Sequence, residues 1–367
     1  MSRIAVLGAG VMASALTNPA RDNGHEVHLI GTHLDDHIID SIRSSGIHPV
    51  LGVRLDPGVV AHHFSDIDEG FEGADVVMVG VNSFGIDWAG KQLARHLRPG
   101  QKVLVVTKGL QAETDGTLRI LPHILQRAVG DLADQVTWSA IVGPCIAGEL
   151  AIRRPSCVVF SGEDRSSFEF LADLYRTDYY HVWTSTDLVG HEVGAATKNV
   201  FAFAAGFAEG ILHNEPEPES PYVMFNYSAA LFAQGSLEIH QYIRMLGGDP
   251  TTGDGLGGVG DMYVTSMGGR NVRAGSYVGR GIPFSQVRDV HMKGITLEGV
   301  AAIGVIGAAL DKLTARGVVG TEDFPLSRFL FDVVHHDAPL HVPWSSFFGG
   351  ERHSPPPLPT ASRNDDR

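Results

Sequence analysis

The chain contains only two cysteines, Cys145 and Cys157, among its 367 residues. Two thiols cannot form a disulfide framework, so we expect both to be reduced. No apolar run approaches the roughly 20 residues that a membrane span requires. The N-terminus, MSRIAVLGAG, has no apolar signal core with a cleavage site. These absences predict a soluble, cytoplasmic protein.

Positive charge is also scarce, since 28 Lys and Arg against 42 Asp and Glu give a net charge of −14. Proteins that bind nucleic acid or membrane surfaces generally need basic stripes, so neither partner is expected. An anionic substrate would have to be attracted by a local cluster of positive side chains.

Metal-ligand spacing and the Gly-x-Ser-x-Gly elbow of serine hydrolases are both absent. The adjacent pairs His62-His63 and His335-His336 are not spaced one helical turn apart, and we interpret them as surface histidines. We therefore predict no metal site and no serine hydrolysis.

Short β-type runs alternate with helical stretches in the first half of the chain. The helical stretches include residues 11–22 and 86–97, and the predicted strands are Arg3–Leu7, Glu26–Ile30, Val76–Val81, Lys102–Thr107, Trp138–Val142 and Cys157–Ser161. Strands without strict alternation, separated by helices, indicate a parallel sheet covered on both faces. The sequence thus predicts a doubly wound α/β domain over residues 1–188.

Strand signals almost vanish after residue 188, and an all-α domain is predicted over residues 189–348. Its expected helices are Val189–Leu212, Tyr222–Leu246, Leu297–Ala315 and Phe324–His335. We interpret two glycine-rich segments, Gly247–Gly260 and Gly268–Gly281, as loops. The proline-rich and polar segment 349–367 is predicted to be a disordered tail.

A glycine-rich motif, Gly8-Ala9-Gly10-Val11-Met12-Ala13, follows the first predicted strand and opens a helix. Gly8 permits a tight turn, Gly10 lets the backbone approach a pyrophosphate, and Ala13 allows close packing of helix on strand. The free N–H groups of Val11 and Met12 at the helix start can then bind phosphates. This is a dinucleotide fingerprint.

The end of the second strand reads Gly31-Thr32-His33, where an NAD site usually carries an acid for the ribose 2′-hydroxyl. The acids Asp35 and Asp36 come later. We therefore favour NADP over NAD, with Thr32 and His33 as candidate partners, although no arginine supports the choice.

Lys198 and Asn199 stand in the middle of an otherwise apolar helical run, Glu192–Phe207. A lysine is rarely buried without a partner, and Asp261 is the candidate. Other candidate ligand residues follow strand ends or lie in the glycine-rich segments: Lys108, Gly143, Cys145, Arg270 and Asn271.

These motifs together resemble the NAD(P)-dependent glycerol-3-phosphate dehydrogenases from Arg3 to about His335. The matching motifs are Gly8-Ala9-Gly10, Thr107-Lys108-Gly109-Leu110, Gly143-Pro144-x-x-Ala147-x-Glu149, Glu192-x-Gly194-Ala195-x-x-Lys198-Asn199-Val200, Gly260-Asp261 with Thr265, and Arg270-Asn271. The segments Gly31-Thr32-His33 and His48–Val53 are more similar to an archaeal-type branch.

The resemblance implies a Rossmann domain, a helical substrate domain, and reversible hydride transfer between NAD(P)H and C2 of dihydroxyacetone phosphate. It implies that Lys198, with Lys108 and Asp261, is catalytic. The implied substrate residues are Lys108, Gly143, Cys145, Lys198, Asn199, Asp261, Thr265, Arg270 and Asn271. The implied cofactor residues are Gly8, Gly10, Val11, Met12, Thr32, His33, Lys108, Ala147, Arg270 and Glu298.

Three features depart from the common bacterial pattern. Cys145 and Gly269 each replace a residue with a hydroxyl, and the acidic, proline-rich insert 213–221 follows the lysine helix. A different small phosphopolyol or phosphonate therefore stays open as the substrate. A β-hydroxyacid dehydrogenase is a further alternative, although the asparagine that such enzymes place one turn after the lysine is Ala202 here. A redox-cofactor sensor without turnover is disfavoured by the intact lysines. The apolar helices are compatible with a homodimer.

Overall fold

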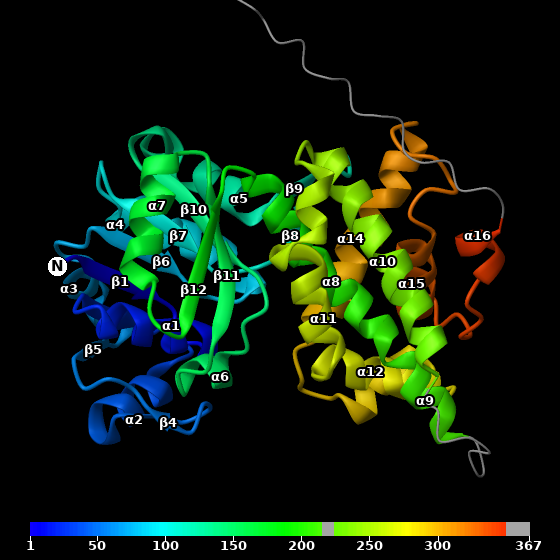
Figure 1. Cartoon of the computed structure of the whole chain (residues 1–367), viewed down its shortest axis with the longest axis horizontal. Helices are drawn as coiled ribbons and strands as arrows, with labels where there is room; N and C mark the ends of the chain where they lie inside the picture. Colours follow the sequence, from blue (N-terminus) through cyan, green and yellow to red (C-terminus); the bar gives the residue numbers. More distant parts are fainter. Residues whose placement is uncertain (215–223, 350–367) are drawn as a thin grey trace, which may run out of the picture.

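The computed structural model describes residues 1–214 and 224–349, which form a sheet-containing half and a helical half (Figure 1). The main sheet has eight strands in the order β12-β11-β10-β7-β6-β1-β2-β5. Their bounds are β1 (Arg3–Leu7), β2 (Glu26–Ile30), β5 (Val59–His62), β6 (Val76–Val79), β7 (Lys102–Val105), β10 (Thr137–Val142), β11 (Ser156–Gly162) and β12 (Tyr180–Ser185).

Helices cover both faces of this sheet, as the doubly wound prediction requires. Ile4 and Val6 of β1 pack into one buried cluster, whereas Ala5 and Leu7 of the same strand pack into the other. Consecutive residues are therefore buried on opposite faces, which explains the continuous apolar runs. The helices of this half are α1 (Val11–Asp22), α2 (Asp36–Ser45), α3 (Ile67–Phe71), α4 (Ile86–His96), α5 (Leu121–Val129), α6 (Ala147–Ala151) and α7 (Arg165–Tyr175).

The strand order changes direction at β1, which lies between β2 and β6. Ligands of open α/β sheets bind beyond the carboxyl ends of the strands at such a point. The sequence predicted a parallel sheet, and the structure departs from this at one edge, because β10 and β11 pair antiparallel. The chain leaves β10, passes through the short helix α6 and enters β11 from the same edge, without crossing back.

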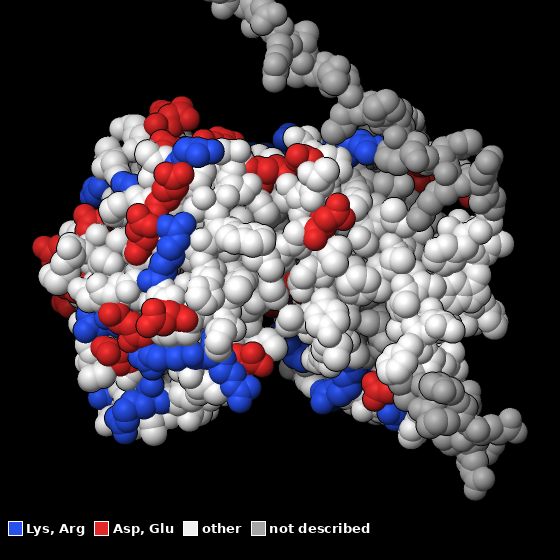
Figure 2. Space-filling view, in the orientation of Figure 1, with Lys and Arg blue, Asp and Glu red and all other residues white. Residues whose placement is uncertain are grey.

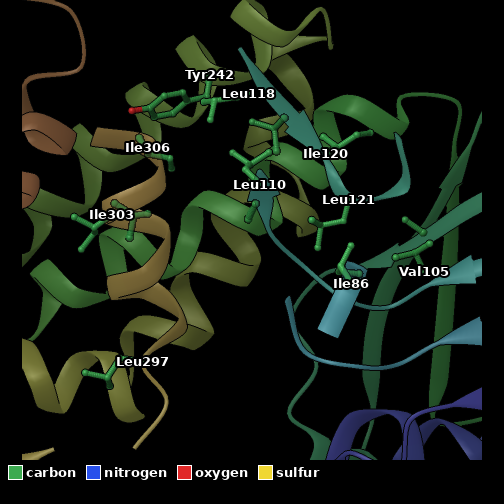
Figure 3. Close-up of a cluster of buried hydrophobic side chains, with 14 of the residues drawn as sticks. Ile86, Val105, Leu110, Leu118, Ile120, Leu121, Tyr242, Leu297, Ile303 and Ile306 are labelled. Carbon is green, nitrogen blue, oxygen red and sulfur yellow. The ribbon is translucent and has the colours of Figure 1, made fainter. Parts of the chain in front are cut away.

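Two small hairpins were not predicted. β3 (Ile47–His48) pairs with β4 (Val53–Arg54), and β8 (Leu110–Ala112) pairs with β9 (Leu118–Ile120). Figure 3 shows the apolar side chains of the second hairpin between those of the sheet half and those of α14. The buried cluster is continuous from Val105 through Leu110 to Ile306, so the two halves share a core.

The helical half is built around α8 (Leu188–Ala205), against which α10, α11, α12 and α14 pack. Almost every residue of α8 is buried, as the apolar run predicts. The other helices are α9 (Phe207–His213), α10 (Phe225–Leu246), α11 (Asp261–Ser266), α12 (Arg270–Gly279), α13 (Phe284–Gln286), α14 (Glu298–Ala315), α15 (Pro325–His335) and α16 (Trp344–Phe348).

The prediction of a loop over Gly268–Gly281 is wrong, because α12 occupies most of that segment. Its glycines allow close helix packing: a Cβ on Gly275 would lie 1.9 Å from the carbonyl oxygen of Phe203, and one on Gly279 would lie 2.3 Å from that of Phe207. The glycines therefore remove side chains where two helices touch, and they do not mark a turn.

Three predictions concern the insert, the tail and the boundary between the domains. Residues 215–221 of the insert and 350–367 of the predicted tail lie outside the described residues. The division into domains at residue 188 stays a prediction; the last sheet strand ends at Ser185 and α8 begins at Leu188. Within the described ranges, no helix combines the length and apolarity needed to cross a membrane.

Candidate active site

The loop after β1 has the backbone shape that a dinucleotide fingerprint requires. Gly8 has φ +105°, and a Cβ there would lie 3.1 Å from the backbone of Gly80. Gly10 is the N-cap of α1 in an extended conformation. Gly80 in turn leaves room for Ala13, since a Cβ on Gly80 would lie 2.4 Å from that of Ala13. This cradle fits a pyrophosphate at the start of α1.

Most of the predicted ligand residues line one cavity of about 320 Å³ between the halves. It contains residues from the ends of β1, β6, β7 and β10 together with the lysine helix. The predicted residues in its wall are Gly10, Val11, Met12, Lys108, Gly143, Cys145, Lys198, Asn199 and Glu298. Residues separated by almost 300 positions thus meet at the carboxyl edge of the sheet.

A second cavity, of about 390 Å³, shares Gly10, Gly80, Val81 and Asn82 with the first. Thr32 and His33 line it, and His33 packs near Trp88, with ring centroids 5.9 Å apart. The two cavities therefore adjoin at these four residues, and together they extend from the end of the second strand to the lysines.

Asp261 pairs with both lysines of the site. Its Oδ2 accepts a hydrogen bond from Lys108 Nζ at 2.8 Å, and its Oδ1 accepts one from Lys198 Nζ. Asp261 is 1 % exposed and Lys198 is 8 % exposed. The pairing of Lys198 with Asp261 predicted from the sequence is thus present, and Lys108 is a second partner.

The two lysines have opposite pKa shifts. Burial lowers the pKa of Lys198 to about 8, with the charge of Asp261 opposing this shift and that of Lys108 reinforcing it. Burial also disfavours the charged form of Lys108, but the charge and hydrogen bond of Asp261 outweigh it and raise its pKa. Lys198 is therefore the amine that can change protonation state near neutral pH.

Two predicted substrate residues, Arg270 and Asn271, lie at the N-terminus of α14. Asn271 Oδ1 accepts from the N–H of Gly299 at 3.1 Å, and Arg270 lies 3.9 Å from Glu298. Thr265 Oγ1 donates to the carbonyl of Asp261 at 2.7 Å. Unlike Glu298, the residues Asp261, Thr265, Arg270 and Asn271 do not line the 320 Å³ cavity.

The outer surface carries positive charge near this site. Figure 2 shows the molecule hollowed between its halves, with basic side chains beside the lower end of the hollow, over α6 and α12. α12 begins at Arg270, whereas the predicted cofactor residue Ala147 begins α6. Acidic side chains lie beside these basic ones, and Arg154 and Arg270 are 4.0 and 3.9 Å from Glu149 and Glu298.

Three site features escaped the sequence prediction. Asn82 and its neighbours follow β6 and line both cavities. Their position directly after a predicted parallel strand could have indicated this, because ligands bind at the carboxyl ends of such strands. Asp35 turns back and contacts the glycine loop. Glu192 is 0 % exposed, and burial raises its pKa to about 8; neither carboxyl oxygen has a hydrogen-bond partner among the described residues.

The interpretation of His62 as a surface residue is wrong. It is 5 % exposed, and its Nε2 lies 2.7 Å from Nδ1 of His28 on the adjacent strand. His62 closes strand β5, which the sequence prediction missed, so its burial could not be foreseen.

Known proteins match nearly the whole chain. The family description "NAD-dependent glycerol-3-phosphate dehydrogenase N-terminus" matches residues 3–168, and the corresponding C-terminus matches residues 187–343. An NADP(+)-dependent glycerol-3-phosphate dehydrogenase of Archaeoglobus fulgidus is 34% identical over 286 residues, which cover 78% of this chain and 82% of that protein. The chain belongs to the glycerol-3-phosphate dehydrogenase family. It is an NAD(P)-dependent oxidoreductase, as the motifs predicted.

Other members of the glycerol-3-phosphate dehydrogenase family agree in extent and fold. The enzyme of Bacillus velezensis, named for NAD(P)+, is 32% identical and covers 82% of each chain. A glycerol-3-phosphate dehydrogenase structure from Coxiella burnetii has a TM-score of 0.76, with 22% identity and coverage of 94% of this chain and 97% of that one. The Rossmann-type sheet followed by a helical half is confirmed as the family fold.

Proposed function

We propose that the chain interconverts dihydroxyacetone phosphate and sn-glycerol 3-phosphate, with Lys198 as the acid and base of the reaction. The observation that supports this most directly is the position of Lys198: it is buried in α8, lines the cavity beside the glycine loop and is paired with Asp261. Reduction of a ketone develops negative charge on its oxygen, which a nearby ammonium group can stabilise and then protonate.

Each site residue then has a defined task. Gly10, Val11 and Met12 would hold the dinucleotide phosphates, and the bound dinucleotide supplies the hydride. Lys198 holds a proton at Nζ and donates it to the oxygen at C2; in the reverse direction the neutral amine accepts it. Asp261 orients Nζ through Oδ1. A pKa of about 8 keeps both protonation states accessible for the two directions.

The phosphate of the substrate would be held by Lys108, Arg270 and Asn271. Lys108 lies in the cavity wall, and the partly exposed side chain of Arg270 offers a fork of N–H donors that suits a phosphate. Binding of this remote group would position C2 for reaction. Asn199, beside Lys198 in the same wall, would hydrogen-bond a substrate hydroxyl.

We infer a preference for NADP over NAD. Thr32 and His33 line the second cavity, and Asp35 already accepts two backbone N–H groups through a single oxygen. The Archaeoglobus relative named above is also NADP(+)-dependent. The proposed homodimer and the cytoplasmic location stay predictions.

Lys198→Met tests the assignment. The variant should lose roughly 10²- to 10⁴-fold in kcat for dihydroxyacetone phosphate, while NADPH binding measured by fluorescence stays nearly unchanged. Lys91→Met, at an exposed lysine, is the matched control. Near-normal turnover of Lys198→Met would refute the role of the lysine.

A substrate panel with the wild-type chain tests the substrate and the cofactor. The panel compares dihydroxyacetone phosphate, unphosphorylated dihydroxyacetone and a β-hydroxyacid, each with the matching NADP(H) and NAD(H) forms. We expect activity on the phosphate ester and a higher kcat/KM with NADPH. Equal activity on dihydroxyacetone would contradict the phosphate site.

A further inference from the structure

Side chains hold both backbone polar groups of Ala9, in the middle of the glycine loop. Its N–H donates to Asp35 Oδ2 at 3.3 Å, and its carbonyl accepts from His48 Nε2 at 3.0 Å. Ser14 Oγ of α1 also donates to this carbonyl, at 3.4 Å, whereas Asp35 precedes α2 and His48 ends β3. Residues 26 and 39 positions away thus brace the loop that carries the dinucleotide motif.

Asp35 connects the glycine loop to the end of the second strand. Its Oδ2 also accepts the N–H of Thr32 at 2.8 Å, so one carboxyl oxygen joins two loops at the carboxyl edge of the sheet. Both donors are backbone groups whose directions are fixed by the fold. Asp35 therefore links the position of the loop after β1 to that of the loop after β2, and these loops line the same cavity.

The tautomer of His48 follows from its contacts. Nδ1 lies 3.2 Å from the N–H groups of both Val50 and Leu51 and accepts from them, so the ring hydrogen is on Nε2 and points to Ala9. His48 is 0 % exposed. Protonation of Nδ1 would remove its ability to accept and would break the hydrogen bonds from Val50 and Leu51.

We propose that Asp35 and His48 are positioning residues for the dinucleotide. They fix the backbone at Ala9 so that the free N–H groups at the start of α1 keep the direction needed for phosphate binding. This rests on the proposed cofactor site and goes beyond it, since neither residue belongs to the fingerprint. The carboxylate of Asp35 acts by positioning the glycine loop, and Thr32 and His33 are the residues that would recognise the ribose 2′ group.

Direct cofactor binding without substrate provides the test, because it does not depend on the identity of the substrate. NADH and NADPH are titrated by fluorescence against wild type, Asp35→Ala and Asp35→Asn. Asp35→Ala should weaken both cofactors about tenfold and by similar factors. Asp35→Asn keeps an oxygen that can accept both N–H groups, and it should recover most of the affinity.

Asp36→Ala is the matched control, because it removes the same charge one residue away, where the carboxylate contacts His63 on the surface. Equal weakening by Asp36→Ala would show a general charge effect and overturn the proposal. Unchanged binding in Asp35→Ala would overturn it as well. An Asp35→Asn variant that shifts the ratio of affinities about tenfold toward NADPH would show that Asp35 reads the ribose.

His48 gives an independent readout through pH. Asp35 and His37 are the titratable groups whose charges act on it, and burial holds its pKa below the ordinary value. Calorimetric binding of NAD+ between about pH 5 and pH 8 should weaken at the acid end in wild type. In His48→Phe, binding should be weaker throughout, and the acid loss should disappear. The same acid limb in His48→Phe would exclude His48 as the positioning group.

Discussion

Glycine has two different structural uses in this molecule, and one pair of glycines from each half shows the contrast. In the sheet half, Gly8 and Gly143 end buried strands with φ +105° and +122°, conformations that other residues rarely adopt. In the helical half, Gly210 and Gly275 lie within or against helices, and a Cβ on either would lie about 2 Å from a carbonyl oxygen of the facing helix. Gly8 and Gly143 therefore provide backbone freedom, whereas Gly210 and Gly275 remove a side chain where two helices touch.

Gly275→Ala should give the largest effect, because a methyl group would overlap the backbone of Phe203, which cannot move aside without shifting α8. We expect the free energy of unfolding to fall by more than about 3 kcal/mol, measured by urea denaturation. Gly268→Ala, where no atom lies within 4 Å of the added Cβ, is the control. Equal stability of the two variants would contradict the close packing of α12 on α8.

Gly8→Ala should give a smaller loss of stability, of about 1–3 kcal/mol, because the left-handed φ is strained for alanine. Its effect on NADPH affinity should be larger than its effect on folding, since the loop itself would shift away from Gly80. Gly24→Ala shares the positive φ but has no atom within 4 Å of the new Cβ. It should lose stability and keep its cofactor affinity; similar affinity of both variants would refute the cradle.

At the junction between the halves, the pKa of Lys198 leads us to expect a smaller effect, on the pH dependence of kcat. Ketone reduction needs protonated Lys198, so kcat for reduction should fall as pH rises through about 8, and kcat for oxidation should rise over the same range. Lys108→Gln removes a neighbouring positive charge and leaves Asp261 to Lys198 alone. The pH at which kcat for reduction falls should then be higher by about one unit. If the pH at which kcat falls is the same in Lys108→Gln and wild type, Lys198 is not the group that titrates.

The parts of the fold predicted well are those fixed by local pattern. β1, β2 and α1 were predicted with their observed bounds, because short buried strands around a glycine fingerprint leave few alternatives. Asp261 was predicted as a partner because a buried lysine needs a counterion, whichever elements carry the two residues. The roles of the site residues are still predictions.

The features that the sequence analysis missed depend on contacts between distant parts of the chain, which residue spacing does not reveal. α12 was mistaken for a loop because its glycines serve a neighbouring helix. Asp35 comes too late in the chain to match the fingerprint, yet the turn before α2 returns its carboxylate to Ala9. The antiparallel pairing of β10 with β11 depends on the short connection through α6.

The β8–β9 hairpin belongs to the first half of the chain in sequence, but its apolar side chains are part of the core that it shares with the helical half. It lies within the first family segment, yet Leu110, Leu118 and Ile120 fill the space between the sheet and α14 (Figure 3), and Asp115 at its tip bonds Arg316 at 2.8 Å. A gene divided between the two segments would leave the helical polypeptide without part of its interior. The two pieces would have to associate through this hairpin as complementing fragments, and Lys108, two residues before the hairpin, would be brought with it.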